Sequence, residues 1–145
     1  MLNKSSIKIV SVCSAIVGAI VAIPAMIPLV RGIAFLALMF FVAPFIIVYL
    51  KRLEIIKFDT PEKYLTVGAI AGAASFIGFA IVYFPITLLL NLIFKIQAFI
   101  WVKVVFTNFV FLVAMLILIA LLNALFNAFA AFITANIYQY IENRR

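Results

Sequence analysis

The fold is decided by residues 104–140, which read VVFTNFVFLVAMLILIALLNALFNAFAAFITANIYQY and contain no glycine, proline or charged residue. As one α-helix, these roughly 37 residues would extend about 55 Å, whereas about 20 apolar residues are enough to cross the hydrocarbon core of a bilayer. The stretch therefore predicts a transmembrane helix that is longer than the bilayer requires.

This helix is predicted to have two unlike faces. Small and amide-bearing side chains share one face of the helical wheel, namely Ala120, Asn123, Asn127, Ala130, Ala131, Thr134 and Tyr138. Bulky side chains take the other face, namely Phe126, Phe129, Ile133 and Ile137. Because interfaces between membrane helices are rich in small and hydrogen-bonding residues, we expect the first face to contact protein and the second to face lipid or another subunit.

The composition of the whole chain agrees with a membrane protein. Of its 145 residues, 70% are hydrophobic and only 10% are charged, and the mean hydropathy is +1.39. A soluble domain usually has about 25% charged residues. We therefore expect one membrane domain over residues 1–145. The net charge of +7 does not indicate nucleic-acid binding, because the basic residues are spread among the ends of the apolar segments.

Four apolar segments predict an all-α antiparallel bundle of four transmembrane helices, with long third and fourth helices. The predicted spans are residues 9–30, 33–50, 64–94 and 104–138, and residues 51–63 form a charged loop. Pro24 and Pro28 each remove a backbone hydrogen bond, so the first helix should kink or end there, and Pro44 lies inside the second span. Residues 95–103 carry two lysines, which favours a short link over a fifth span.

Small residues form a seam on the third span and a matching seam on the first. The third-span seam is Gly68, Ala71, Gly72, Ser75 and Gly78, and the first-span seam is Ser11, Ser14, Ala15, Gly18 and Ala22. Seams of this kind let two helix backbones approach closely. We expect six of these residues to pack helices together: Ser14, Gly18, Gly68, Gly72, Ser75 and Gly78.

The spans carry none of the residues on which membrane enzymes and proton-coupled pumps usually depend. Their interiors contain no Asp, Glu, Lys, Arg or His, and the chain has no nucleotide-binding, zinc-protease or catalytic-triad motif. Cys13 is the only cysteine; acylation is one interpretation, because it lies near the cytoplasmic end of its span, and a small apolar packing residue is the interpretation that we favour. The sequence therefore predicts no enzyme activity, no catalytic residue, no cofactor and no metal.

Polar side chains inside the spans are the remaining candidates for a site. They are Asn91, Asn123, Asn127 and Thr134. One interpretation is a polar track for a small solute or an ion. The other is hydrogen bonding between helices, worth about 0.6 kcal/mol per contact on average. We favour the second, because Asn136 lies opposite Asn127 on the helical wheel and the amides do not form one continuous lining.

The basic residues predict the orientation in the membrane. With four spans, one side holds Lys4, Lys8, Lys51, Arg52, Lys57, Lys63, Arg144 and Arg145, and the other side holds Arg31, Lys95 and Lys103. Because cytoplasmic loops are enriched in Lys and Arg, both termini and residues 51–63 should be cytoplasmic.

This plan resembles that of small four-span bacterial inner-membrane proteins with a glycine-rich third span, and the resemblance implies a bacterial plasma membrane. We expect a non-enzymatic structural or accessory subunit that contacts membrane lipid and assembles with itself or with other membrane proteins. The alternative is a small oligomeric channel, a holin-like pore or a transporter for uncharged solutes.

Overall fold

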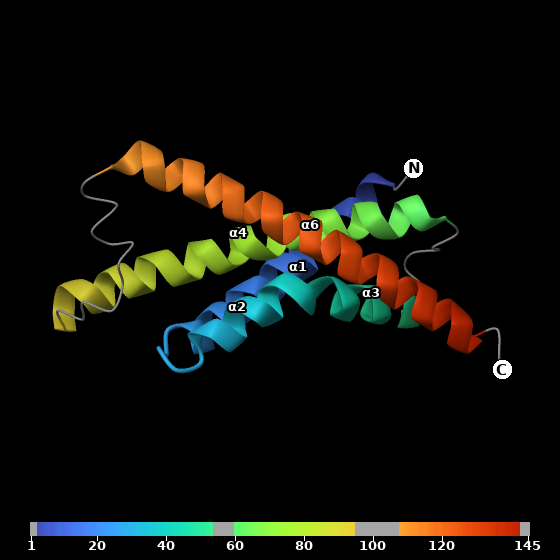
Figure 1. Ribbon diagram of the computed structural model, residues 1–145, viewed down its shortest axis with the longest axis horizontal. Helices are drawn as coiled ribbons and strands as arrows, with labels where there is room; N and C mark the ends of the chain where they lie inside the picture. Colours follow the sequence, from blue (N-terminus) through green and yellow to red (C-terminus); the bar gives the residue numbers. More distant parts are fainter. Residues whose placement is uncertain (1–2, 54–59, 95–107, 143–145) are drawn as a thin grey trace.

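The computed structural model is all-helical and describes residues 3–53, 60–94 and 108–142. Its helices are α1 (Lys4–Ala25), α2 (Arg31–Phe40), α3 (Val42–Arg52), α4 (Pro61–Phe94) and α6 (Phe109–Glu142) (Figure 1). Within these ranges, α1, α4 and α6 are each long and apolar enough to cross a membrane, and the bent pair α2–α3 makes a fourth span if it is counted as one. The predicted membrane bundle is confirmed.

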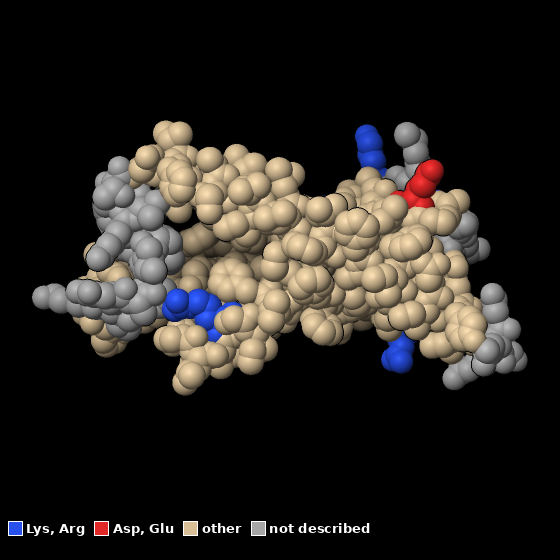
Figure 2. Space-filling view, in the orientation of Figure 1, with Lys and Arg blue, Asp and Glu red and all other residues tan. Residues whose placement is uncertain are grey.

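The helices run alternately between two ends of the bundle. The start of α1, the end of α3, the start of α4 and the end of α6 lie at one end, and the α1–α2 connection lies at the other (Figure 1). On the face shown in Figure 2, the described charged side chains lie towards the two ends, and a broad uncharged belt separates them. This distribution of charge suits a membrane-spanning protein, because charged groups are costly in the hydrocarbon core of a bilayer.

α4 is the central helix of the bundle. Its most extensive contacts are with α1 and α6. Both α4 and α6 are 34 residues long, as their apolar sequences predict. They cross near the middle of the molecule and separate towards the end where α6 begins (Figure 1). The two long helices therefore cover each other over only part of their length.

At the terminal end of the bundle, polar contacts hold α6 against its neighbours. The Gln139 side-chain amide of α6 donates a hydrogen bond to the Tyr64 hydroxyl of α4 at 3.1 Å. The Lys51 ammonium of α3 lies 3.9 Å from the centre of the Tyr138 ring, a cation–π geometry. These long amphipathic side chains suit the bilayer interface, where one end of the side chain is apolar and the other is hydrated.

Prolines set the ends of two helices. α1 ends at Ala25, between Pro24 and Pro28, so the first helix is shorter at this end than the predicted span 9–30. The second predicted span, residues 33–50, is not one continuous helix: α2 ends at Phe40, α3 begins at Val42, and the two are bent by 50°. Pro44 explains the break, because its ring clashes with the carbonyl four residues earlier, at Phe40, and it has no N–H to donate.

The two faces of α6 largely follow the sequence pattern. All members of its small face are buried or half-buried, and Phe129, Ile133 and Ile137 are exposed. Phe126 differs from the expectation, because it is half-buried and its ring packs against Phe40 at a centroid distance of 5.2 Å. Residues 104–107 of the predicted fourth span lie outside the described residues.

Candidate functional site: two buried asparagines

Asn123 and Asn127 are the two buried asparagines in the described part of the chain. They lie one turn apart on α6, with exposed fractions of 1% and 0%. The Asn127 Nδ2 group donates to the Asn123 backbone carbonyl at 3.0 Å and approaches the Asn123 Oδ1 atom at 3.4 Å. Because residues four apart face the same side of a helix, both amides point into the bundle.

Asn123 binds the backbone of α4. Its Nδ2 group donates to the Gly72 carbonyl at 2.7 Å and lies 3.3 Å from the Ser75 Oγ atom. The Ser75 hydroxyl donates to the same Gly72 carbonyl at 2.9 Å. The short distance depends on Gly72 itself, since a Cβ atom there would lie only 2.5 Å from the Asn123 backbone oxygen. Glycine at this position therefore permits both the close approach and the hydrogen bond.

Asn127 binds the break between α2 and α3. Its Nδ2 group donates to the Leu38 carbonyl at 3.0 Å, and its Oδ1 atom accepts from the Ala43 N–H at 2.9 Å. In a continuous helix, the Leu38 carbonyl would accept from Val42 and the Ala43 N–H would donate to Met39. One side-chain amide therefore supplies a donor and an acceptor where the helical ladder is interrupted.

The two hydrogen bonds of Asn127 to Leu38 and Ala43 have a large energetic consequence inside a membrane. An unsatisfied backbone group in hydrocarbon costs several kcal/mol, because no water is present to bind it. Breaks in membrane helices are tolerated where neighbouring side chains satisfy the freed groups. Both Leu38 and Ala43 are buried, so water is not an alternative partner. The arrangement can hold a bent span rigidly, and both polar ends of the Asn127 amide are used in doing so.

The other predicted polar candidates lie elsewhere. Asn91 is half-buried on α4, 19 residues beyond Gly72, which is about 28 Å along the helix. The Thr134 hydroxyl donates to the Ala130 carbonyl of its own helix at 2.7 Å. The structure thus brings Asn123 and Asn127 together, and it does not join the four candidates into one track.

The predicted seam of α4 is divided between two neighbouring helices. A Cβ atom at Gly68 would lie 2.6 Å from the Asn127 backbone oxygen, so Gly68 and Gly72 both contact α6. On the other side, a Cβ atom at Gly18 of α1 would overlap the Ser75 carbonyl, and one at Gly78 would overlap the Ala15 carbonyl. The seam residues do not form a straight row along α4 but shift gradually around it. Gly68 and Gly72 therefore face α6, and Gly78 faces α1.

Ser14 is the sixth predicted packing residue and lies fully buried on α1. Among the described residues, its hydroxyl oxygen has no hydrogen-bond partner. Ser14 therefore contributes small volume to the interface, and its hydroxyl contributes no bond to a neighbouring helix.

Sequence reasoning missed the residues that Asn127 binds. They are backbone groups of Leu38 and Ala43, which carry no side-chain signal, and the only local sign of the break is Pro44. In the described ranges, no group of three or more His, Cys, Asp or Glu side chains could hold a metal ion. Comparison of the chain with protein-family models, curated proteins and solved structures finds no match.

Proposed function

We propose that this protein is a non-enzymatic structural or accessory membrane subunit that assembles with copies of itself or with other membrane proteins. The observation that carries the proposal is a row of exposed bulky side chains on the second half of α6. We call this row the α6 ridge; it comprises Leu125, Phe129, Ile133 and Ile137. The opposite face of the same half-helix is already used inside the bundle, where Asn127, Ala131 and Ala135 are buried.

The length of α6 favours a protein partner for part of this ridge. Its 34 residues extend about 51 Å, while the hydrocarbon core is about 30 Å thick. Even a steep tilt of about 40° lengthens the path through the core only to about 39 Å. Part of the helix must therefore leave the hydrocarbon. Bulky apolar side chains outside the core are stabilised by the headgroup layer or by a partner surface.

The alternative is a small oligomeric channel, a holin-like pore or a transporter for uncharged solutes. Such a function needs polar groups that are available to water or to a solute. The Asn123 amide is instead bonded to the backbone of α4, and the Asn127 amide to the backbone of α2, α3 and its own helix. This use of the buried amides is the reason for placing the structural role first.

The proposed assembly is tested by the size of the particle. The full chain would be analysed by native mass spectrometry in lipid nanodiscs and by native electrophoresis of gently solubilised source membranes. We expect a homo-oligomer in the first measurement or a larger complex in the second. In a background with Cys13→Ser, cysteine placed at Phe129 should form cross-links between chains, while cysteine placed at Ile20 of α1, which is also exposed, should not. A monomer in both measurements would contradict the proposal.

We also propose a bacterial plasma membrane with both termini in the cytoplasm. Of the described basic residues, Lys4, Lys8, Lys51, Arg52 and Lys63 lie near the end that holds the termini, and Arg31 begins α2 at the other end. Lys57, Lys95, Lys103, Arg144 and Arg145 lie outside the described residues. The excess of positive charge supports a cytoplasmic position for the terminal end.

The orientation is tested by labelling single cysteines in intact cells with a membrane-impermeant maleimide, again with Cys13→Ser. Thr60 and Leu29 are exposed at opposite ends of the bundle. We expect Leu29→Cys to be labelled from outside and Thr60→Cys to react only after permeabilisation. The reverse pattern would refute this orientation.

A further inference from the structure

The outer side of α1 carries a row of exposed side chains that changes from charged to apolar along the helix. Starting in the first turn, every fourth residue is exposed, and we call these residues the α1 row: Lys4, Lys8, Val12, Ile16 and Ile20. Residues spaced by four form a continuous ridge at a small angle to the helix axis. The two lysines therefore lead directly into an exposed aliphatic surface.

The buried side of α1 explains why this row points away from the bundle. The buried residues follow the same spacing of four, but two positions out of step with the α1 row: Val10, Ser14, Gly18 and Ala22. Two residue steps correspond to about 200° around a helix, so the two rows lie on opposite sides. The buried row packs against the chain's own bundle, where α4 is the main neighbour of α1. The α1 row therefore faces the surroundings of the protein.

The first two turns of α1 concentrate positive charge. Lys4 and Lys8 are one helical turn apart, with Cβ atoms about 6 Å from each other, so both ammonium groups can reach one anion. The first turn contains no acidic residue, and a lysine at the positive end of a helix dipole is unfavourable. Among the described residues, neither lysine forms an ion pair. An anion from outside the chain would offset this charge.

The order of charge and apolar surface along α1 indicates the kind of ligand. Long lysine stems lie along apolar surface and place their ammonium groups in the headgroup layer. A phospholipid has the same order, with a negatively charged phosphate above its acyl chains. A headgroup without a cation of its own leaves that negative charge for the lysines. We propose that the α1 row binds an anionic phospholipid, with the phosphate at Lys4 and Lys8 and one acyl chain along Val12 and Ile16.

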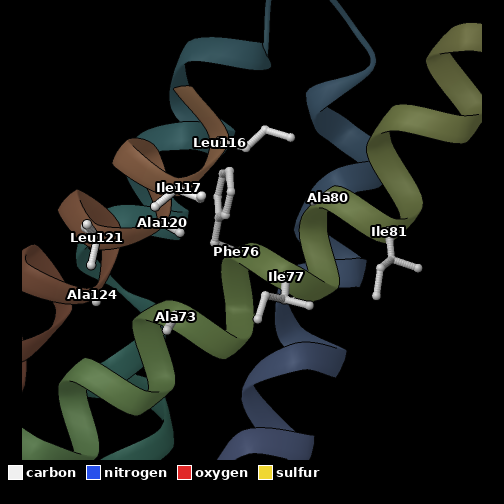
Figure 3. A pocket seen from close by; sticks show the side chains of 10 residues that line it. All are labelled: Ala73, Phe76, Ile77, Ala80, Ile81, Leu116, Ile117, Ala120, Leu121 and Ala124. Carbon is white, nitrogen blue, oxygen red and sulfur yellow. The ribbon is translucent and has the colours of Figure 1, made fainter. Parts of the chain in front are cut away.

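A second exposed surface of the bundle lacks this charge and serves as a comparison. The groove between α4 and α6 is lined only by hydrocarbon side chains, among them Ile77 and Leu121 (Figure 3). Helix α6 also contains no lysine or arginine. Lipid at this surface therefore meets no group that distinguishes an anionic headgroup from a zwitterionic one.

The proposal is tested by quenching of tryptophan fluorescence with brominated lipids. The full chain carries Val12→Trp together with Trp101→Phe, which removes the only native tryptophan. It is placed in vesicles of brominated phosphatidylglycerol with unbrominated phosphatidylcholine, and in the converse mixture. The ratio of the two quenching values gives the relative binding of the two lipids beside Val12. We expect phosphatidylglycerol to be preferred about tenfold, equivalent to about 1.4 kcal/mol.

The control position is Leu121, which is 64% exposed and lines the uncharged groove. With Leu121→Trp in place of Val12→Trp, the two lipids should quench about equally. Each ratio compares two lipids at one tryptophan, so a difference in depth between the two positions does not affect it.

Two variants with the same change of charge show which cations are responsible. Lys8→Gln should lower the preference beside Val12 several-fold, and the double variant Lys4→Gln with Lys8→Gln should abolish it. Arg52→Gln is the matched control, because Arg52 is exposed at the same end of the bundle but lies on α3. It should leave the preference unchanged. All these residues are exposed, and circular dichroism checks that each variant folds.

Three results would overturn the proposal. Equal quenching by the two lipids beside Val12 would mean that α1 does not select an anionic lipid. The same preference at Leu121 as at Val12 would mean that the selection is not local to α1. Equal effects of Lys8→Gln and Arg52→Gln would mean that only the total charge of this end attracts anionic lipid. None of these results depends on the oligomeric state, so the structural role proposed above is tested separately.

Discussion

The two sides of α4 are built differently. Towards α1, Gly18 and Gly78 allow each helix to press against the backbone of the other, and the nearby Ser14 hydroxyl has no partner among the described residues. Towards α6, Gly68 and Gly72 allow an equally close approach, and the amides of α6 add hydrogen bonds. One interface is thus specified by shape, and the other by shape and polar bonding.

The difference shows what a polar residue adds to a membrane interface. Small residues bring two backbones together wherever their seams match, so shape alone tolerates sliding or a change of partner. Asn123 and Asn127 fix the register, because their hydrogen bonds can form only with particular backbone groups of α4, α2 and α3. The α6 side therefore determines how three segments meet.

The largest effect is expected from adding bulk where backbones touch. Gly72→Leu and Gly78→Leu should each lower the free energy of unfolding by about 3 kcal/mol or more, because the added atoms meet backbone that cannot move aside. The measurement is reversible unfolding in detergent or bicelles.

Gly32→Leu is the control for these two variants, because a Cβ atom at Gly32 would meet nothing within 4 Å. Phe129→Leu on the exposed ridge should also be mild. If all four variants melt alike, neither side of α4 is a close backbone contact.

A smaller effect, confined to the α6 side, is expected from Asn127→Leu. This change removes the partners of the Leu38 carbonyl and the Ala43 N–H, and it should cost about 2 kcal/mol of unfolding free energy. Asn136→Leu is the matched control, since Asn136 is exposed and, among the described residues, donates to no group but the Phe132 carbonyl of its own helix. It should change stability by less than about 0.5 kcal/mol. Similar losses of stability for the two variants would mean that the buried hydrogen bonds do not distinguish the α6 side of α4 from its α1 side.

The smallest effect, with the opposite sign, is expected from Ser14→Ala on the α1 side. Burial of a hydroxyl without a partner is unfavourable, so its removal should leave stability unchanged or raise it by up to about 1 kcal/mol. Thermal melting of the variant beside the wild type gives the sign. A clear loss of stability would show that the hydroxyl does bind something in the membrane, and shape alone would no longer describe this side.

The sequence predicts well where the helices begin and end, but it predicts poorly which helices contact each other, and the reason is physical. Apolar length and proline position act locally, so the extents of α4 and α6 and the end of α1 just after Pro24 follow from the residues themselves. Which helix each glycine meets depends on the slow rotation of the seam and on the whole packing. The break of the second span could have been suspected from Pro44.

The partner of Asn127 could not have been found from the sequence. Asn127 is separated by 84 residues from Ala43 and by 89 from Leu38, and it binds both through backbone atoms that every residue type possesses. The buried face of α6 was predictable, because small and amide residues recur on it at helical spacing. The sequence could not predict how that face is used, namely that the Asn127 side chain replaces the interrupted hydrogen bonds between α2 and α3.

The most direct measurement is the distance between the backbone nitrogen of Ala43 and the side-chain carbonyl carbon of Asn127. Solid-state NMR dipolar recoupling in lipid bilayers, with ¹⁵N in alanine and ¹³C in the asparagine side chain, gives this distance, and Ala43→Gly identifies the signal. A hydrogen bond with a 2.9 Å N–O separation predicts that the two nuclei lie within about 4 Å. Absence of coupling, as for a separation beyond about 6 Å, would show that Asn127 does not bind the break and would contradict the proposed role of the buried amides.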